Sequence, residues 1–340
     1  MSGDRIQGAF VGLAVGDAAG WPAARHRAAL HAPWSRRLHR ELDAFAEEHR
    51  LTTLPVPFAL NQPVAPLALG PSDDAEWLAW TALTIDRPRA EAFRELGGDV
   101  RARVSVATAL GNLARGVEPP ASGHDNPHHF DDAAAVRAVA FGALGRDPTE
   151  DAQVTNSGDG VLGAQAMARA VAEAVATGSA AAAVRAALDV LPADTAIGHN
   201  ARLALDVARA AGDPFAAVPA LDAALLDHVY SYAVGAAQTV PVALALTEVA
   251  GGSPAAAVPA AACLAPLADS APALTGALTG ACGGLAAIAE GWISTARTLT
   301  GCCLPRLAGQ DLLTLAATFT PTFTPTFTPT LTTTSTEEPA

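Results

Sequence analysis

The sequence is poor in aromatic residues and in long runs of strand-forming residues. Aromatic residues make up 5% of the 340 residues, whereas half of the residues are hydrophobic and alanine dominates. A large β-sheet is therefore not predicted. This composition favours helices that pack closely through small side chains. A chain of this length can bury one large core or two modest ones.

Basic residues are also scarce. The chain has 21 lysines and arginines against 34 acidic residues, which gives a formal net charge of -13. No basic stripe is present that could neutralise phosphates, so we expect no nucleic-acid partner. An acidic chain is better suited to binding divalent cations.

Cysteines are few, and none of them forms a C-x-x-C pair. We interpret the four cysteines as reduced, buried thiols of a cytoplasmic protein. The first residues lack the basic and apolar regions of a secretory signal peptide, which supports the same expectation. The cysteines are Cys263, Cys282, Cys302 and Cys303.

Two uncharged stretches, residues 229–247 and 270–289, are about long enough to span a bilayer. Both are rich in Gly, Ala, Thr and Pro, and neither is flanked by a clear Lys/Arg cluster or an aromatic belt. We interpret them as buried core helices and expect no membrane association. Membrane-spanning helices are the alternative.

Periodic apolar residues, with glycines and prolines at their boundaries, predict more than ten helices and no strand. This pattern favours an all-α bundle in one domain, residues 1–318. Residues 319–340 repeat Phe-Thr-Pro, which prevents both helix and central strand, so we expect a disordered Thr/Pro-rich tail. The predicted helices cover residues 5–20, 35–48, 72–85, 89–97, 99–115, 131–145, 159–177, 179–190, 196–211, 214–226, 229–250, 254–264, 271–299 and 309–317.

The first predicted helix carries a glycine at every fourth position, at Gly8, Gly12, Gly16 and Gly20. These glycines lie along one face, where another backbone can pack close against them. Asp17 lies inside this otherwise apolar helix. A carboxylate in that position must be hydrogen-bonded, paired or bound to a ligand.

Two short polar motifs follow proline-rich segments. Ser72-Asp73-Asp74 opens a predicted helix, and Asp269-Ser270 precedes another. The simplest interpretation of each is a helix cap with acidic residues near the helix dipole. The alternative is that hydroxyl and carboxylate oxygens from both motifs form a Mg²⁺ site. A third polar segment, residues 124–132, combines histidines with Asp131 and Asp132. It is either a Zn²⁺ site or, more simply, a polar loop capped by Asp131.

The motifs resemble those of a known family. Gly12 to Gly20 read G-L-A-V-G-D-A-A-G, which is similar to the G-L-A-x-G-D-A-x-G start of the ADP-ribosylglycohydrolases. Ser72-Asp73-Asp74 resembles the T-D-D metal motif of that family. Asp269-Ser270 resembles part of its G-G-D-T-D-T motif. The resemblance covers about residues 5–317, and its specificity lies in the order and spacing of the motifs.

This resemblance implies an all-α fold, a single large orthogonal multi-helix bundle of the ADP-ribosylglycohydrolase type. It also implies a hydrolase that cleaves a glycosidic bond in an ADP-ribosylated protein or a small ADP-ribosyl compound. Mg²⁺ or Mn²⁺, as one or two ions, would be the cofactor. The implied metal ligands are Ser72, Asp73, Asp74, Asp269 and Ser270, with Asp73 and Asp74 also catalytic. The implied substrate-binding residues are Asp17, Asp132, Arg137 and Asn156, of which the last three match their motifs loosely.

The family's G-N-G loop reads Asp131-Asp132-Ala133 here, and two single positions also depart from the family pattern. Leu267 replaces the first Asp of D-T-D-T, and Ala24 replaces a Glu seven residues after Asp17. Losing a carboxylate at Leu267 weakens one metal site, so we expect one Mg²⁺ site containing Asp73 and Asp74. The alternative function is a catalytically inactive ADP-ribose-binding or structural relative.

Overall fold

The computed structural model describes residues 2–20, 70–96, 100–226 and 234–319, together with residues 44, 47, 48 and 50. Within these ranges the chain forms α-helices and short 3-10 turns. Extended pairing is limited there to two isolated bridges, Asp131 with Gly235 and Thr298 with Asp311. The predicted all-α class is therefore confirmed.

The first half of the described chain contains α1 (Ser2–Gly20), α4 (Asp73–Thr84), α5 (Arg89–Arg94), α6 (Val104–Ala114), α7 (Ala121–His124), α8 (Ala133–Ala143), α9 (Thr149–Thr155) and α10 (Asp159–Thr177). The second half contains α11 (Ala180–Leu188), α12 (Ala196–Ala211), α13 (Pro214–Leu225), α14 (Ala236–Val249), α15 (Pro254–Ala262), α16 (Ala271–Gly283), α17 (Glu290–Ala296) and α18 (Leu312–Ala317).

Helices that end at a glycine in the left-handed conformation are predicted with the observed bounds. The predictions for α10 and α12 have the observed bounds, because left-handed glycines end both helices, Gly178 (φ 74°) and Gly212 (φ 71°). A single helix over residues 271–299 is wrong, because Gly284 (φ 75°) ends α16 and α17 begins separately. The short α7 and α9 were not predicted. The predicted helix over residues 35–48 lies almost entirely outside the described residues, as do Ala24 and residues 320–340 of the predicted tail.

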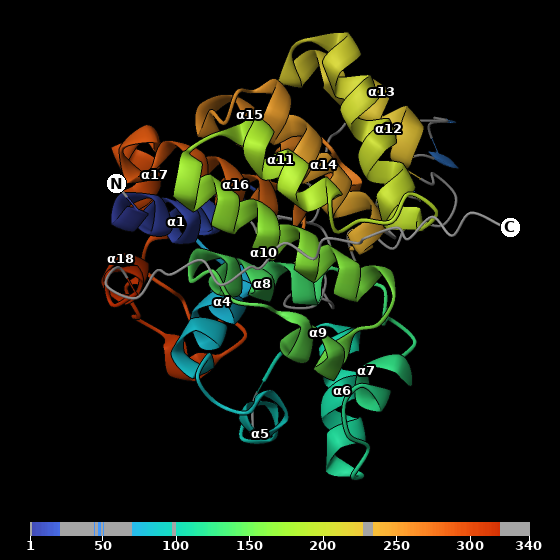
Figure 1. The fold of residues 1–340 in the computed structure, drawn as a ribbon, viewed down its shortest axis with the longest axis vertical. Helices are drawn as coiled ribbons and strands as arrows, with labels where there is room; N and C mark the ends of the chain where they lie inside the picture. The colour runs from blue at the N-terminus through green and yellow to red at the C-terminus, as the bar shows by residue number, and fades with distance from the viewer. Residues whose placement is uncertain are drawn as a thin grey trace, which may run out of the picture.

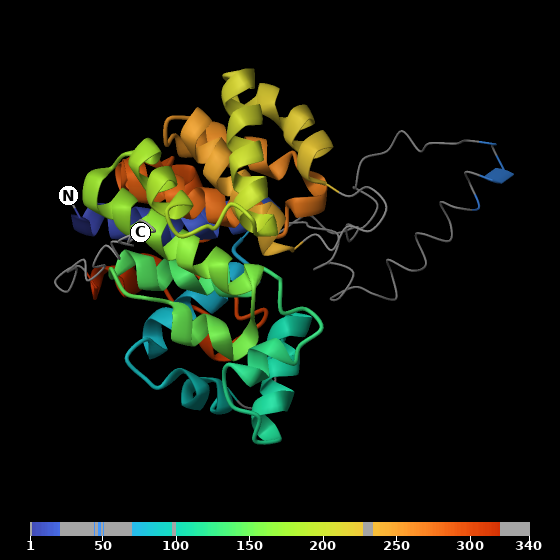
Figure 2. The ribbon, with the colours of Figure 1, turned by 45° about the vertical axis from the view of Figure 1, so that its right-hand side comes forward.

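Figures 1 and 2 show α12 and α13 at one end of the molecule and α5, α6 and α7 at the other. Between them, α8 packs against α10, and α1 packs against α16. Buried alanine, valine and leucine side chains from these layers form one continuous hydrophobic core. The small side chains that dominate the composition let the helix axes approach closely.

The helices α1 and α16 lie side by side (Figure 1) and meet at the glycine seam, where Gly8, Gly12 and Gly16 of α1 face α16. A Cβ atom added at Gly12 would lie 2.1 Å from the carbonyl oxygen of Gly276. One added at Gly8 would lie 2.1 Å from the carbonyl oxygen of Gly280. The predicted backbone-to-backbone packing is therefore confirmed, and the two helices run antiparallel.

The two uncharged stretches hold core helices. α14 is 14 residues long and α16 is 13, and most residues of both are buried. Among the helices that the structure describes, none combines the length and apolar character needed to cross a bilayer. Residues 229–233 of the first stretch lie outside the described part.

Candidate functional site

Asp17, near the end of α1, caps the start of α4. Its Oδ2 accepts hydrogen bonds from the backbone N–H groups of Ser72 (2.7 Å) and Ala75 (3.1 Å), and its Oδ1 accepts one from the Ser72 hydroxyl (2.5 Å). Burial and the charge of Asp73 raise the pKa of Asp17 to about 7, although these hydrogen bonds act in the opposite direction. The capping carboxylate thus comes from another helix, and the Ser72 hydroxyl makes no capping bond to its own helix.

Next to this cap lies a buried group of charges, which we call the acidic cluster: Asp73, Asp74, Asp132 and Asp269 around Arg103. Arg103 Nη2 lies 2.8 Å from Asp74 Oδ1 and 3.6 Å from Asp269 Oδ2. Its Nη1 contacts Asp132 Oδ1, and its Nε lies 3.6 Å from Asp73 Oδ2. The cluster brings together the starts of α4, α6, α8 and α16.

The second serine of the predicted site also faces this cluster. The Ser270 hydroxyl accepts a hydrogen bond of 2.6 Å from Arg103 Nη2 and makes no capping bond to α16. Ser72 Oγ lies 3.4 Å from Asp73 Oδ1. Both serines occupy N-cap positions, yet neither hydroxyl is used as a local cap. Simple helix capping therefore does not account for the two motifs.

One guanidinium faces four carboxylates in this buried group. The Arg103 side chain is 11% exposed, and those of the four aspartates are 8% exposed or less. Burial alone would lower the pKa of Arg103, but the charges of the four carboxylates raise it above its ordinary value. Burial raises the pKa of Asp74 well above its ordinary value and that of Asp132 to about 7, although the Arg103 charge opposes both shifts.

Three carboxylates of the acidic cluster each keep one buried oxygen without a hydrogen-bond partner. These atoms are Asp74 Oδ2, Asp132 Oδ2 and Asp269 Oδ1. Buried carboxylate oxygens without partners are costly in a folded protein, and hard divalent cations bind such oxygens. The donor chemistry of the cluster therefore fits Mg²⁺ or Mn²⁺.

Comparison with known proteins now decides the family. The sequence model described as ADP-ribosylglycohydrolase matches residues 2–321, nearly the whole chain. The chain belongs to the ADP-ribosylglycohydrolase family. It is therefore an ADP-ribosylglycohydrolase-like hydrolase, from a family that acts on ADP-ribosyl substrates and is typically metal-dependent.

A solved structure shows the same fold. It is titled "ADP-ribosylglycohydrolase-related protein complex" and is 18% identical in sequence, with a TM-score of 0.57. The match covers 95% of this chain and 99% of the other. No curated protein matches this chain.

Most family-matched residues meet at the acidic cluster or its cap: Asp17, Ser72, Asp73, Asp74, Asp132, Asp269 and Ser270. Arg103, at the centre, was not predicted. It stands at the N-cap position of α6 and belongs to no recognised motif. Only its long-range contacts with residues from three other segments reveal its role, so the sequence held no local signal for it.

Arg137 lies instead in a second buried network, which we call the arginine pair: Arg89 and Arg137 sharing Asp151. Arg137 Nε donates to Asp151 Oδ2 (2.8 Å), and its Nη2 donates to the Thr155 hydroxyl (2.7 Å). Arg89 Nε donates to Asp151 Oδ1 (2.9 Å). A substrate-binding role for Arg137 stays a prediction, and its visible contacts are those of a core network.

Asn156 is fully buried and fixes the loop before α8. Its Nδ2 donates to the backbone oxygen and Oδ1 of Asp131 (3.0 and 2.9 Å) and to the backbone oxygen of His129 (3.1 Å). Because Asp131 adjoins Asp132, these bonds help to place the acidic cluster. A direct role of Asn156 in substrate binding stays a prediction.

Leu267 has no exposed surface and belongs to the hydrophobic core. It ends a short 3-10 turn, Ala265–Leu267, two residues before Asp269. Its side chain offers no donor atom at the position where the family carries an aspartate. This observation is consistent with the expectation of one metal site and not two.

Another group has metal-like spacing. Ligand atoms of Glu76, Cys302 and Cys303 lie within 4.8 Å of one another, close enough to hold a metal ion. Glu76, however, already accepts hydrogen bonds of 2.7–2.8 Å from the backbone N–H groups of Cys302, Cys303 and Leu304. The contact with Cys302, together with burial, raises the pKa of the Cys303 thiol. We interpret the group as a clamp that fixes this loop against α4.

The histidine-rich segment, residues 124–132, does not form a zinc site within the part of the chain that the structure describes. Among the described residues, only the group of Glu76, Cys302 and Cys303 has the spacing of metal ligands. Asn126 instead ties the segment to its surroundings, because its side chain donates to the backbone oxygens of Ser105 (2.7 Å) and Thr155 (2.9 Å). The polar-loop interpretation is supported by these bonds.

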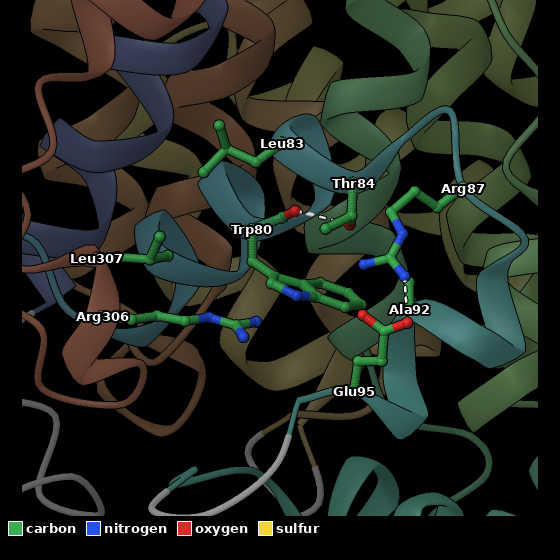
Figure 3. A pocket seen from close by; sticks show the side chains of 8 residues that line it. All are labelled: Trp80, Leu83, Thr84, Arg87, Ala92, Glu95, Arg306 and Leu307. Carbon is green, nitrogen blue, oxygen red and sulfur yellow. Dashed lines mark hydrogen bonds and ion pairs between the residues drawn. The ribbon is translucent and has the colours of Figure 1, made fainter.

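A small surface hollow lies at the opposite end of α4 (Figure 3). It has a volume of about 210 Å³, and Trp80 forms part of its wall between Arg306 on one side and the Arg87–Glu95 ion pair on the other. Trp80 is six residues beyond Asp74, or about 9 Å along the helix. None of the cluster residues lines this hollow, so we do not assign it to the candidate active site.

Proposed function

We propose that this chain hydrolyses the glycosidic bond of an ADP-ribosyl group on a protein side chain or a small compound. The acidic cluster would be the active site, Mg²⁺ or Mn²⁺ the cofactor, and the cytoplasm the compartment. The observation that supports the site is the set of three buried carboxylate oxygens without partners, on residues matched to the family motifs. All four cysteines are free, which is compatible with a reducing compartment, although Cys263 is exposed and Cys302 half-buried, so the prediction of buried thiols holds only for Cys282 and Cys303.

The oxygen donors of the cluster suit one divalent cation, which would require the carboxylates to draw closer together than they lie in this structure. Asp73, Asp74, Asp269 and Ser270 would hold it, with Ser72 beside them and Leu267 unable to contribute to a second site. When bound, the cation would orient the ribose hydroxyls and lower the pKa of a water molecule.

The chain's own residues would then position and deprotonate that water. Asp74 Oδ2 is the natural proton acceptor, because it has no other hydrogen-bond partner. Asp73 is the second candidate acceptor. Asp17 would hold Ser72 and the α4 N-terminus in place, and Asp132 would contact the substrate side of the cluster.

The direct test is hydrolysis of ADP-ribosyl-arginine and ADP-ribosyl-serine with Mg²⁺. We expect Asp74→Ala and Asp73→Ala to lower the rate by on the order of 10²-fold or more, the usual contribution of a positioned proton acceptor. A chelator should abolish activity, and added Mg²⁺ should restore it. Asp86→Ala is the control, because it removes an exposed carboxylate (79%) just after α4. Equal rates of hydrolysis in the three variants and the wild type would show that the acidic cluster takes no part in catalysis.

The second candidate function is an ADP-ribose-binding protein without catalysis. It is favoured by Leu267 in the core and by the Arg103 guanidinium among the would-be ligands. Calorimetry with ADP-ribose, with and without Mg²⁺, separates the two functions. Binding without hydrolysis supports the binder, and neither binding nor hydrolysis indicates a structural role.

A further inference from the structure

Arg103 occupies the place in the acidic cluster where its carboxylates converge. Its three guanidinium nitrogens contact Asp74 and Ser270 within 2.8 Å, Asp132 at short range, and Asp73 and Asp269 at 3.6 Å. A planar, permanently charged guanidinium suits carboxylates at several angles. The carboxylates are thus arranged around a cation that the chain itself supplies.

The spacing of the carboxylates matches the guanidinium and not a small ion. Mg²⁺ binds oxygens at about 2.1 Å, so two of its ligands lie at most about 4.2 Å apart. Within the described residues, no three carboxylates of the cluster bring oxygens within 4.8 Å of one another. An ion bound by three of them therefore requires them to draw together into the space that the guanidinium fills.

Arg103 nevertheless leaves the cluster incompletely neutralised. One positive charge faces four carboxylates, and three buried oxygens keep no partner. A divalent ion would bring twice the charge to the same oxygens, and buried carboxylates gain strongly from compensation. Exchange of the guanidinium for an ion is therefore favourable for the carboxylates.

The side chain can leave without disturbing the elements that carry the carboxylates. Arg103 belongs to the start of α6, whereas the carboxylates lie at the starts of α4, α8 and α16. Its backbone segment is held separately, since the Arg101 N–H donates to the Cys303 carbonyl (3.0 Å). Opening the cluster would therefore require the Arg103 side chain to move, and not the helices that carry the carboxylates.

We propose that Arg103 is a built-in cation that occupies the divalent-ion position of the acidic cluster and competes with the ion for it. This inference rests on the cluster being the cation site of the proposed function, but not on hydrolysis. It predicts weak divalent-ion binding in the wild type and stronger binding once the guanidinium is removed.

The test is calorimetric titration with Mn²⁺ alone, supported by the electron paramagnetic resonance signal of free Mn²⁺. We expect Arg103→Ala to bind Mn²⁺ at least tenfold more tightly than the wild type. Arg101→Ala is the matched control, because it removes an exposed positive charge two residues away. It should bind like the wild type. Equal or weaker binding by Arg103→Ala than by the wild type overturns the proposal.

Arg103→Ala leaves four buried carboxylates without a counter-charge, so it can fail to fold without an ion. Refolding of this variant on addition of Mn²⁺, followed by circular dichroism, supports the proposal. If Arg103→Ala stays unfolded with Mn²⁺, the same Mn²⁺ titration of Arg103→Lys tests the proposal. A lysine keeps one charge but cannot span the carboxylates. Tighter Mn²⁺ binding than in the wild type supports competition, and equal or weaker binding overturns it.

These titrations contain no ADP-ribosyl compound, so their outcome is independent of turnover. Tight Mn²⁺ binding by the wild type that weakens in Arg103→Ala would refute the competition and leave hydrolysis possible. Tighter binding in the variant, without hydrolysis by any variant, would support the competition and refute the proposed function.

Discussion

The acidic cluster and the arginine pair are both buried and both join arginines to aspartates, but their balance of charge is opposite. In the acidic cluster one guanidinium meets four carboxylates. In the arginine pair two guanidiniums share the single carboxylate of Asp151. Both oxygens of Asp151 accept hydrogen bonds, whereas three cluster carboxylates keep an oxygen without a partner.

Aromatic rings add to the compensation of the arginine pair, although Arg89 Nη2 has an ion-pair contact with Asp151 but no hydrogen-bond partner. Arg89 lies 5.0 Å from the ring centre of Trp80, and Arg137 lies 5.1 Å from that of Phe93. Aromatic faces stabilise cations in a buried setting. The arginine pair has the contacts of a network that stabilises the fold, whereas the acidic cluster keeps carboxylate oxygens without hydrogen-bond partners.

The largest effect is expected at the arginine pair. Asp151→Ala would leave two buried guanidiniums without a counter-charge, which costs about 3–5 kcal/mol in the free energy of unfolding. Urea denaturation monitored by circular dichroism measures it. Glu118→Ala is the control. It breaks the surface ion pair of Arg94 with Glu118, whose carboxylate is 60% exposed, so it should change the free energy of unfolding little. If Asp151→Ala lowered the free energy of unfolding no more than Glu118→Ala, the arginine pair would not be a network that stabilises the fold.

A much smaller change in stability is expected in the acidic cluster. Asp269→Asn removes one of four mutually repelling charges and keeps the shape of the side chain. The free energy of unfolding should stay within about 1 kcal/mol of the wild type, because breaking an ion pair is costly only where the partner is left uncompensated. Divalent-ion affinity, by contrast, should fall. Destabilisation as large as that of Asp151→Ala would erase the distinction between the two networks.

The smallest effect is expected at a third, partly exposed pair, Arg297 with Asp311. Burial alone would raise the pKa of Asp311, but hydrogen bonds from the Thr314 N–H and Arg297 lower it below its ordinary value of 3.8. The ionised Asp311 carboxylate therefore contributes its full stabilisation at pH values above 3.8, and this stabilisation is lost as the pH falls through the lowered pKa.

Asp311→Asn keeps one oxygen that can accept from the Thr314 N–H, and it removes the charge and the second acceptor that faces Arg297. At pH 7 it should lower the free energy of unfolding by less than about 1 kcal/mol, as is usual for such pairs. Thermal unfolding at several pH values should show this difference shrinking below pH 4. A difference that stays constant to pH 2 would show that the charge of Asp311 is not responsible.

Sequence patterns predicted what depends on local periodicity or on short motifs. The helix bounds of α10 and α12 follow from their end residues, and the motifs placed Asp73, Asp74 and Asp269 in one site. The spacing of the glycines in α1 predicted that another backbone packs close against this face, but the structure was needed to show that the partner is α16 and that it runs antiparallel. Helix ends and short motifs are encoded in neighbouring residues, so a single sequence reveals them, whereas the common site of Asp73, Asp74 and Asp269 was implied by the order of the family motifs.

Other features depend on contacts between distant segments. Arg103 has no motif, and its position follows from how α6 meets three other helix starts. Arg137 matched a family loop only loosely, and it proved to be held by Asp151, fourteen residues later. The predicted helix over residues 271–299 failed because two adjacent glycines and one positive φ angle end α16 at Gly283.

The glycine seam also limits how the length of this chain can vary. The contacts pair Gly8 with Gly280, Gly12 with Gly276 and Gly16 with Pro272, one helical turn apart. Inserting one residue into either helix would rotate everything beyond it by about 100° and push side chains into the seam. An insertion in α1 before Asp17 would also turn that carboxylate away from the start of α4. Insertions should therefore be tolerated between helices, while a single added residue inside α1 or α16 should disable the site more completely than loss of any one ligand.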